Sequence, residues 1–573
     1  MAETLISPGV LARENDQSFV TSQPVERGAA IIGPAVLGPV EKPTLISSFS
    51  SYQAIFGGAL ESGSGEFTYL TSIAANQYFQ NGGNSLLVTR VTSGSFTSAT
   101  SSAVVGQTGS VVPNAFTLET ISEGAIMNTG TTEITNGALV SGSTDNLRWE
   151  IAASNSASGV FSLLIRRGDD TNNNRVVLES YNNISLDPFA SNYISRAIGD
   201  ISSNLVTEGV DTFLQESGSF PNISNYVRVK SVNNPTPRYF NNDGSAKIQF
   251  TGSMPQVGSG SFNGAVGSNI PTNRTANFYQ NINATDTQGL VGSDYDNAIA
   301  LLANQDDYQF NVISVPGLST QHQTAQITSV MNNSISRGDS IAVIDLVGYN
   351  QPINTVVAQA GGIDNSYTAT YWPWLQTVDP NSGQLVYIPA STFIPGVYAF
   401  TDASSDPWFA PAGITRGGMG QVVRAERKLT STNRDTLYEA NVNPIATFPQ
   451  QGVVVFGQKT LQKAASALDR VNVRRLLITL KEYISQIADN LVFEANTIAT
   501  RQNFLTQVNP YLESVQQRQG LYAFKVVMDE QNNTPDVIDR NELVGQIFLQ
   551  PTRTAEFILL DFNVLPTGAT FPA

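Results

Sequence analysis

The region that begins at Asp294 alternates between helical and strand patterns, and this alternation constrains the fold more than any other feature of the chain. The expected helices and strands alternate in the order 295–304, 310–315, 322–336, 340–346 and 353–360. Two consecutive strands with a helix between them are joined by a crossover connection, so they pair in parallel. The segment therefore predicts a parallel α/β layer.

The last third of the chain carries the longest helical patterns. One helix is expected from about Asn472 to Asp489, and a second from Thr497 to Gln519. Pro510 falls inside the second pattern and predicts a kink or a break, because proline cannot donate the helical hydrogen bond. Strands are expected at 522–528, 546–550 and 556–564.

The composition changes at about Thr92. From there to Ile165 the only basic residue is Arg148, among many Ser, Thr, Gly and Asn. Short alternating segments predict strands and a β-rich insertion that extends to about residue 275. The Gly/Ser-rich stretch from Gly252 to Gly267 is expected to be a flexible, exposed linker.

The residues on which most active sites depend are scarce. The 573-residue chain has no cysteine and one histidine, His322, which excludes thiol catalysis and cysteine-ligated metals. The stretch from Gly452 to Thr460 resembles a phosphate-binding loop, but it has one residue too many before Lys459. We therefore expect no enzyme, no cofactor and no metal, and His322 to be a surface residue.

The charge balance is acidic. Lys and Arg total 31 against 47 Asp and Glu, a formal net charge of −16, which argues against a nucleic-acid partner. Charged residues make up only 14%, which suits a surface largely covered by copies of the same chain. A β-rich surface of extracellular type is the alternative. No apolar run predicts a membrane-spanning helix, and no secretory signal is expected.

One stretch contrasts with this acidity. Between Lys459 and Lys481 there are six basic residues and a single acid, Asp469. We expect the following residues to contact an acidic partner: Lys463, Arg470, Arg474, Arg475 and Lys481. Arg474 and Lys481 are seven residues apart and should share a helix face. Internal salt bridges, to Asp469 and Glu482, remain the other interpretation.

Several motifs, taken together in order and spacing, resemble contractile phage tail sheath proteins. In the second half they are Pro407-Trp408-Phe409-Ala410-Pro411-Ala412-Gly413 with Arg416-Gly417, Asn441-Val442-Asn443-Pro444-Ile445, Phe456-Gly457-Gln458-Lys459-Thr460-Leu461, Asn472-Val473-Arg474-Arg475-Leu476 and Phe493-Glu494-Ala495-Asn496. Near the start they are Ser7-Pro8-Gly9-Val10, the stretch from Gly33-Pro34 to Gly38-Pro39, and Phe56-Gly57-Gly58.

The resemblance implies an α+β multidomain fold: a subtilisin-like α/β domain and an α/β sheath C-terminal domain, with a β-rich inserted domain. The expected division is an N-terminal extended arm at 1–22, a first core segment at 23–92, an outward-facing variable insertion at 93–275, the subtilisin-like domain at 285–455, the sheath C-terminal domain at 456–555 and a C-terminal strand or arm at 556–573.

The resemblance also implies a function. The chain would be a virion structural subunit, assembled in the host cytoplasm, that forms stacked hexameric rings around an inner tail tube. Contraction would drive the tube through the host cell envelope and allow viral genome ejection. Its partners would be its own copies, the tube protein, and baseplate and neck or terminator proteins. A β-rich virion surface protein or adhesin without contraction is the alternative.

In this interpretation the five basic residues face the tube, and the two ends of the chain add strands to neighbouring subunits. The residues expected to take part in strand exchange are Pro8, Val10, Phe557, Ile558, Leu559, Leu560 and Phe562. The run from Phe557 to Phe562 is too apolar to remain exposed, and strand addition would cover it with main-chain hydrogen bonds.

Overall fold

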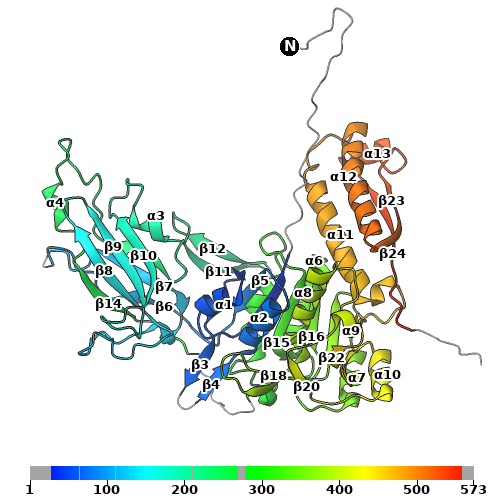
Figure 1. Cartoon of the computed structure of the whole chain (residues 1–573). Helices are drawn as coiled ribbons and strands as arrows, with labels where there is room; N and C mark the ends of the chain where they lie inside the picture. The colour runs from blue at the N-terminus through cyan, green and yellow to red at the C-terminus, as the bar shows by residue number, and fades with distance from the viewer. Residues whose placement is uncertain (1–26, 63–64, 110, 210, 269–277, 558–573) are drawn as a thin grey trace, which may run out of the picture.

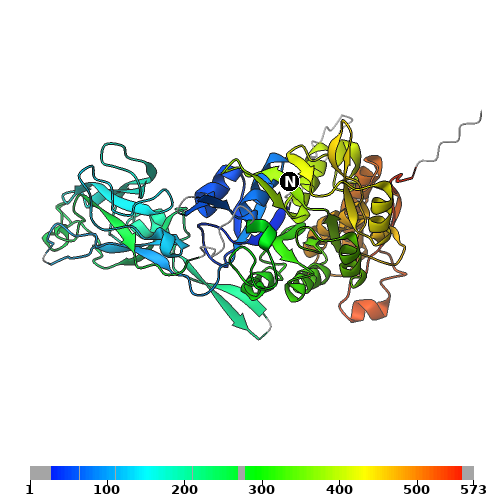
Figure 2. The same cartoon turned by 90° about the horizontal axis from the view of Figure 1, so that it is seen from below.

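The computed structural model describes residues 27–62, 65–109, 111–209, 211–268 and 278–557. These residues form a β-rich part, a central α/β part and a C-terminal part built around two long helices (Figure 1). Seen from below, the central part lies between the other two (Figure 2). The insertion therefore lies on the side of the molecule opposite the C-terminal part.

An eight-stranded sheet forms the central part, in the order β2-β5-β1-β15-β16-β17-β21-β22. Its strands are β1 (Ala29–Gly33), β2 (Thr44–Ile46), β5 (Leu86–Arg90), β15 (Val312–Ser319), β16 (Ile341–Asp345), β17 (Thr368–Trp372), β21 (Asn443–Phe448) and β22 (Gly452–Val455). The six inner strands pair in parallel, and the edge strands β2 and β22 are antiparallel. The parallel layer predicted from the alternation is confirmed. Strands β1, β2 and β5 precede the insertion, so the segments on its two sides share one sheet.

Helices cover both faces of this sheet, which explains why its strands are apolar throughout rather than alternating. One face packs against α1 (Phe49–Phe56), α2 (Leu70–Gln80) and α8 (Ile394–Ser404), and the other against α5 (Asp296–Leu301), α6 (Thr324–Arg337), α7 (Ile353–Gly361) and α10 (Ser431–Glu439). Successive side chains of a strand point to opposite faces. Accordingly, Val343 lies in the first core and its neighbours Ala342 and Ile344 lie in the second.

The insertion is a seven-stranded antiparallel sheet with its own apolar core. In sheet order the strands are β10 (Val177–Ile184), β9 (Val160–Arg167), β8 (Leu147–Asn155), β14 (Gly258–Asn263), β6 (Ser98–Ser101), β7 (Phe116–Glu123) and β13 (Val227–Val232). A separate hairpin, β11 (Ser202–Glu208) and β12 (Asp211–Ser217), extends from it. The predicted β-rich character is confirmed.

The prediction of a flexible, exposed linker at 252–267 is wrong. Residues 258–263 form β14, which pairs with β8 and β6 in the middle of the sheet. Gly260 lies so close to Trp149 that an added Cβ would come within 2.5 Å of the indole ring. Glycine is required at position 260 because the strand passes close to a large aromatic side chain, not because the segment is loose.

The C-terminal part contains α11 (Val471–Asp489), α12 (Ile498–Gln517), β23 (Leu521–Val527), α13 (Pro535–Asp539) and β24 (Gln546–Pro551). Both predicted long helices are confirmed. Pro510 lies inside α12 without ending it. Strands β23 and β24 form an antiparallel pair. The remaining elements are β3 (Ala59–Ser62), β4 (Gly65–Thr68), α3 (Ile194–Ile198), α4 (Ile248–Thr251), β18 (Leu375–Val378), β19 (Leu385–Ile388), α9 (Gly413–Arg416), β20 (Val422–Ala425) and five short 3-10 turns.

Candidate functional site

Helix α11 joins the central part to the C-terminal part, because its two sides are buried in different cores. Val471 and Ile478 belong to the central core, whereas Leu476, Leu480 and Ile487 belong to the C-terminal core. A helix turns by about 100° per residue, so positions 471 and 478 share a side and position 476 lies about 140° away. One rigid helix therefore contributes to both cores and fixes the two parts to each other.

Arg474 and Arg475 lie on either side of the stripe formed by Val471 and Ile478, so they point into the subunit. Each is 4% exposed. The Arg474 guanidinium lies over the Tyr367 ring, 3.9 Å from its centre. The Arg475 guanidinium is 2.5 Å from the Asp402 carboxylate and lies over Tyr398. The expected contact of these two arginines with an acidic partner is therefore corrected: they brace α11 against the central part.

Lys463 and Lys481 are the exposed members of the predicted basic set. The Lys481 Nζ lies 3.1 Å from the Tyr367 hydroxyl, on the ring that Arg474 covers, so the predicted shared face of Arg474 and Lys481 is confirmed. The Lys463 Nζ donates to the Gly361 carbonyl at 2.6 Å. Both ammonium groups contact the subunit while their side chains remain accessible to a partner.

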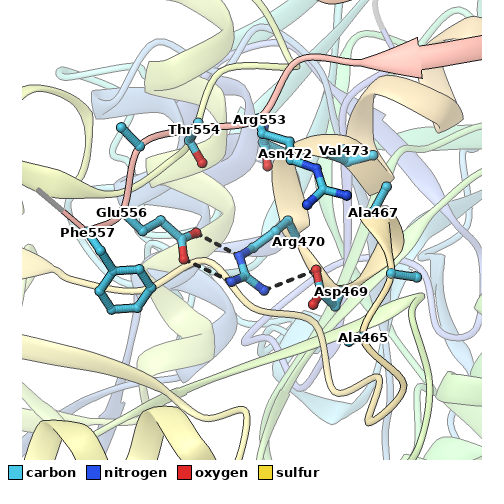
Figure 3. A pocket seen from close by; sticks show the side chains of 12 residues that line it. Ala465, Ala467, Asp469, Arg470, Asn472, Val473, Arg553, Thr554, Glu556 and Phe557 are labelled. Atoms are coloured by element: carbon cyan, nitrogen blue, oxygen red, sulfur yellow. Dashed lines mark hydrogen bonds and ion pairs between the residues drawn. The ribbon is translucent and has the colours of Figure 1, made fainter.

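Arg470, the remaining residue of the set, holds the end of the described chain. We call residues 553–557, which follow β24, the C-terminal strap. The Arg470 Nε and a terminal nitrogen donate to the two Glu556 carboxylate oxygens at 2.7 and 3.0 Å (Figure 3). Asp469 contacts the same guanidinium at 3.0 Å. A bidentate arginine–carboxylate pair fixes both position and orientation, so the strap is held in one place.

Two further side chains complete the anchor of Glu556. The Tyr438 hydroxyl donates to Glu556 at 2.5 Å, and the Gln458 amide donates to it at 3.1 Å. Burial raises the pKa of Glu556, but the hydrogen bonds from Arg470, Tyr438 and Gln458 outweigh that effect and lower its pKa below the ordinary value. The carboxylate is therefore ionised at neutral pH.

The strap runs between two hollows. The first, of about 420 Å³, has a mixed polar and apolar lining of residues that include Ala465, Asp469, Arg470, Val473 and Arg553 (Figure 3). The second, of about 640 Å³, is more apolar and is lined by residues that include Ala410, Ala412, Pro444, Phe456 and Phe557. Phe557 borders both hollows, and its side chain is 83% exposed.

The other residues predicted to exchange strands fall outside the described part of the chain. These are Pro8, Val10, Ile558, Leu559, Leu560 and Phe562. Of the strand expected at 556–564, the structure describes Glu556 and Phe557, and neither is in a strand. The side chain of Glu556 is used for the ion pair with Arg470 instead.

Trp408 is a residue whose role the sequence alone did not reveal. It belongs to the chain of the central part, yet its indole packs in the C-terminal core beside Leu476. Its Nε1–H donates to the Arg518 carbonyl at 3.0 Å, and the Asn472 amide donates to its carbonyl at 3.2 Å. The available signal was a tryptophan placed directly after Pro407 in a segment of small residues.

The remaining chemistry is sparse in the described residues. His322 precedes α6 and is half-buried, and this partial burial lowers its pKa. Within the described ranges, no group of three His, Asp or Glu side chains is placed to hold a metal ion. No helix in these ranges is long and apolar enough to cross a membrane.

Two family models match adjacent parts of the chain. The phage tail sheath protein central domain matches residues 288–461, and the phage tail sheath C-terminal domain matches residues 463–564. Together they span the second part of the central sheet and the whole C-terminal part. The N-terminal strands of the sheet and the insertion lie outside both matches.

Curated relatives agree with these matches. The chain is 31% identical over 362 residues to the tail sheath protein of Vibrio phage KVP40, covering 58% of this chain and 51% of that one. It is 34% identical over 230 residues to the tail sheath protein of Enterobacteria phage T4, covering 40% and 35%. The chain thus spans about half the length, or less, of the curated relatives it matches.

A solved structure supports the fold over nearly the whole chain. The crystal structure of the sheath tail protein of Listeria innocua superposes with a TM-score of 0.51 at 11% identity, covering 92% of this chain and 96% of that one. At this identity the similarity concerns the fold alone, a multidomain arrangement of mixed sheets and helices.

Proposed function

Because this chain belongs to the contractile phage tail sheath family, we propose that it is a structural subunit that polymerises as stacked hexameric rings around an inner tail tube. The observation that carries the proposal is the pair of adjacent domain matches, which cover the second part of the central sheet and the C-terminal part that α11 joins to it. The subunit acts by changing its packing, and no catalytic residue takes part.

The finer division of the chain belongs to this proposal. We propose a central domain that is subtilisin-like in fold only, contributed by residues 23–92 and 285–455. A sheath C-terminal domain follows at 456–555, with arms at 1–22 and 556–573. The insertion at 93–275 faces outward. The position of the insertion on the side opposite the C-terminal part supports this orientation (Figures 1 and 2).

Contraction requires subunits that keep their shape while their contacts change. The extended sheath is a kinetically trapped state, and release by the baseplate lets each subunit rotate as a rigid body into a second packing. The contact of Arg474 with Tyr367 and the ion pair of Arg475 with Asp402 support rigidity, because breaking such a largely buried ion pair costs about 2–4 kcal/mol. The motion drives the tube through the host envelope. Neck or terminator proteins close the sheath, which belongs to the virion and assembles in the host cytoplasm.

The arms connect neighbouring subunits in this proposal. Strands β23 and β24 form a two-stranded sheet in which, among the described residues, no third strand pairs with either. Tyr522 and Phe548 are exposed on these strands, at 64% and 55%. The segments around Pro8 and Val10, and from Phe557 to Phe562, supply the added strands of neighbours. Each net main-chain hydrogen bond contributes about 0.5–1.5 kcal/mol.

Electron microscopy of the purified, negatively stained protein tests the proposal. Long hollow helical tubes are expected. Dispersed particles under all conditions, with no tubes even after the inner tube protein is added, would contradict it and favour a surface protein or adhesin without contraction.

A second measurement tests the tube contact, which now rests on Lys463 and Lys481. Substitution of both by Glu should reduce sheath assembly on preformed tubes, and the reduction should grow as the salt concentration falls. The matched control is Lys428→Glu with Lys230→Glu, which changes the same charge at two exposed lysines outside the C-terminal part. Equal assembly of the two double variants would overturn the tube contact but not the sheath function.

A further inference from the structure

An apolar groove lies beside the C-terminal strap at the junction of the central and C-terminal parts. Its volume is about 640 Å³, and its floor and walls include Ala410, Ala412, Pro444, Phe456 and Phe557. Phe456 is 45% exposed. Polar and charged side chains of α10, such as Arg434 and Asp435, form one rim. An apolar groove with a charged rim is suited to an apolar segment of a polypeptide.

The described chain ends in the strap, beside this groove. Glu556 is fixed by Arg470, Tyr438 and Gln458, so the backbone has a defined position directly before Phe557. Phe557 is itself part of the groove lining. An extended chain advances by at most about 3.3–3.6 Å per residue, so the three residues after Phe557 reach no more than about 11 Å beyond it. The segment that follows Phe557 is therefore attached at the edge of the groove.

The sequence that follows matches the groove in chemistry. Residues 558–560 are Ile-Leu-Leu, and Asp561 is the one charged side chain between Phe557 and Ala573. Arg434 lies over the Phe448 and Phe456 rings at the rim, with centre distances of 5.5 and 5.8 Å. The sequence, an apolar triplet followed by an acid, thus matches in chemistry a groove with an apolar floor and a guanidinium beside it.

We propose that this groove is the docking site of residues 558–560 of the same chain in the subunit before assembly, with Asp561 beside Arg434. The same chain is the occupant because Glu556 tethers the triplet at the groove. A tethered segment has an effective concentration in the millimolar range, far above that of free subunits.

The consequence rests on the proposed function. Residues 558–560 are also proposed to pair with a neighbouring subunit, so the groove covers them until a neighbour offers a sheet edge. Docking and strand exchange then compete for one segment, and assembly begins only where a second subunit contributes more than the groove. The docking itself does not depend on sheath function and is tested separately.

Disulfide cross-linking tests the docking, and the absence of native cysteine makes each engineered pair the only one in the chain. The test variant is the full-length double substitution Asp435→Cys with Leu559→Cys, and a second pair is Ala412→Cys with Leu560→Cys. The control is Ala157→Cys with Leu559→Cys, because Ala157 is exposed in the β8–β9 hairpin of the insertion, far from the groove (Figure 1). Each unassembled variant is mixed in ¹⁴N and ¹⁵N forms and oxidised with copper phenanthroline.

A disulfide requires Cα atoms about 4.4–6.8 Å apart. We expect at least one groove pair to form a disulfide within one chain at least tenfold faster than the control, independently of protein concentration. Mixed-isotope cross-links would place the segment in a neighbour's groove and overturn the proposal. Rates no higher than the control for both groove pairs would also overturn it. Rapid cross-linking in a protein that forms no tubes would leave the docking standing and count against the sheath proposal alone.

Discussion

Arg470 and Glu556 are 86 residues apart and form a bidentate ion pair, with donor–acceptor distances of 2.7 and 3.0 Å. The pair connects the residue that precedes α11 to the last described segment of the chain. It thereby fixes the position of the chain directly before the apolar C-terminal residues.

Substitution of Glu556 by Gln should loosen the strap without unfolding the protein. The variant loses the charge of the pair, which we expect to lower the free energy of local opening at residues 553–557 by about 1–3 kcal/mol. Hydrogen–deuterium exchange of this segment measures the change. The control is Glu542→Gln, which removes a carboxylate from an exposed pair with Arg540 and should leave exchange of the strap unchanged.

The same pair predicts a pH dependence. The folded-state pKa of Glu556 is depressed, so its contribution is present above the ordinary carboxyl pKa of about 4.3 and is lost as the pH falls through the lower folded value. Protection of the strap in the native protein should therefore be constant from pH 7 to about 5 and decrease below about 4. In Glu556→Gln, which cannot titrate at this position, protection of the strap should stay constant over the same pH range. An equal decrease in the native protein and the variant would argue against a role of the ion pair.

Arg475 and Lys481 lie six residues apart on α11 and should respond differently to substitution. Arg475→Met removes the buried guanidinium that pairs with Asp402 and should lower the free energy of unfolding by about 2–4 kcal/mol. Lys481→Met removes an exposed side chain and should change it little. Urea denaturation followed by tryptophan fluorescence compares the two. Equal stability of the variants would show that the Arg475 brace does not hold the two parts together.

Two glycines of β14 give a matched pair in the insertion. Gly260→Ala places a Cβ about 2.5 Å from the Trp149 ring and should destabilise the insertion by about 1–3 kcal/mol, because the strand must move away from the indole. Gly258→Ala meets no atom within 4 Å and should be neutral or slightly stabilising. Thermal unfolding of the two full-length variants distinguishes them, and similar melting temperatures would contradict the close packing on Trp149.

Asp345 should make the central part less stable at high pH. Burial raises its pKa to about 7, and hydrogen bonds from the Ser391 amide and hydroxyl offset this only in part. A raised carboxyl pKa means that the folded state binds the proton more tightly, so this contribution is largest below about pH 4 and declines as the pH rises to 7. Asp345→Asn should therefore be more stable than the native chain at pH 8, by about 1–3 kcal/mol, and differ least at pH 5. Melting temperatures of the variant and the native chain from pH 5 to pH 8 measure this difference in stability. The control for lost charge is Asp307→Asn, because Asp307 is exposed.

Some features followed from local patterns in the sequence. The parallel layer and the two long helices depend on periodicity and on crossover connections, which are properties of short segments. The order of the motifs around Trp408, Asn443 and Arg474 carried the family resemblance. Composition misled at Gly260, because a glycine needed for close packing looks the same in a sequence as a glycine in a loose linker.

The sequence by itself determined that α11 is a helix, how long it is and how its charged residues are spaced. Only the tertiary structure decided which way Arg474 and Arg475 point. A helix with one apolar side would have exposed both arginines to solvent. Helix α11 has two apolar sides, one formed by Val471 and Ile478 and the other by Leu476 and Leu480. Both arginines lie on the side that packs against the central core and are therefore buried. This placement follows only from knowing which core each side of the helix packs against. For the same reason, the pairing of Arg470 with Glu556 could not be read from either residue's neighbours in the chain.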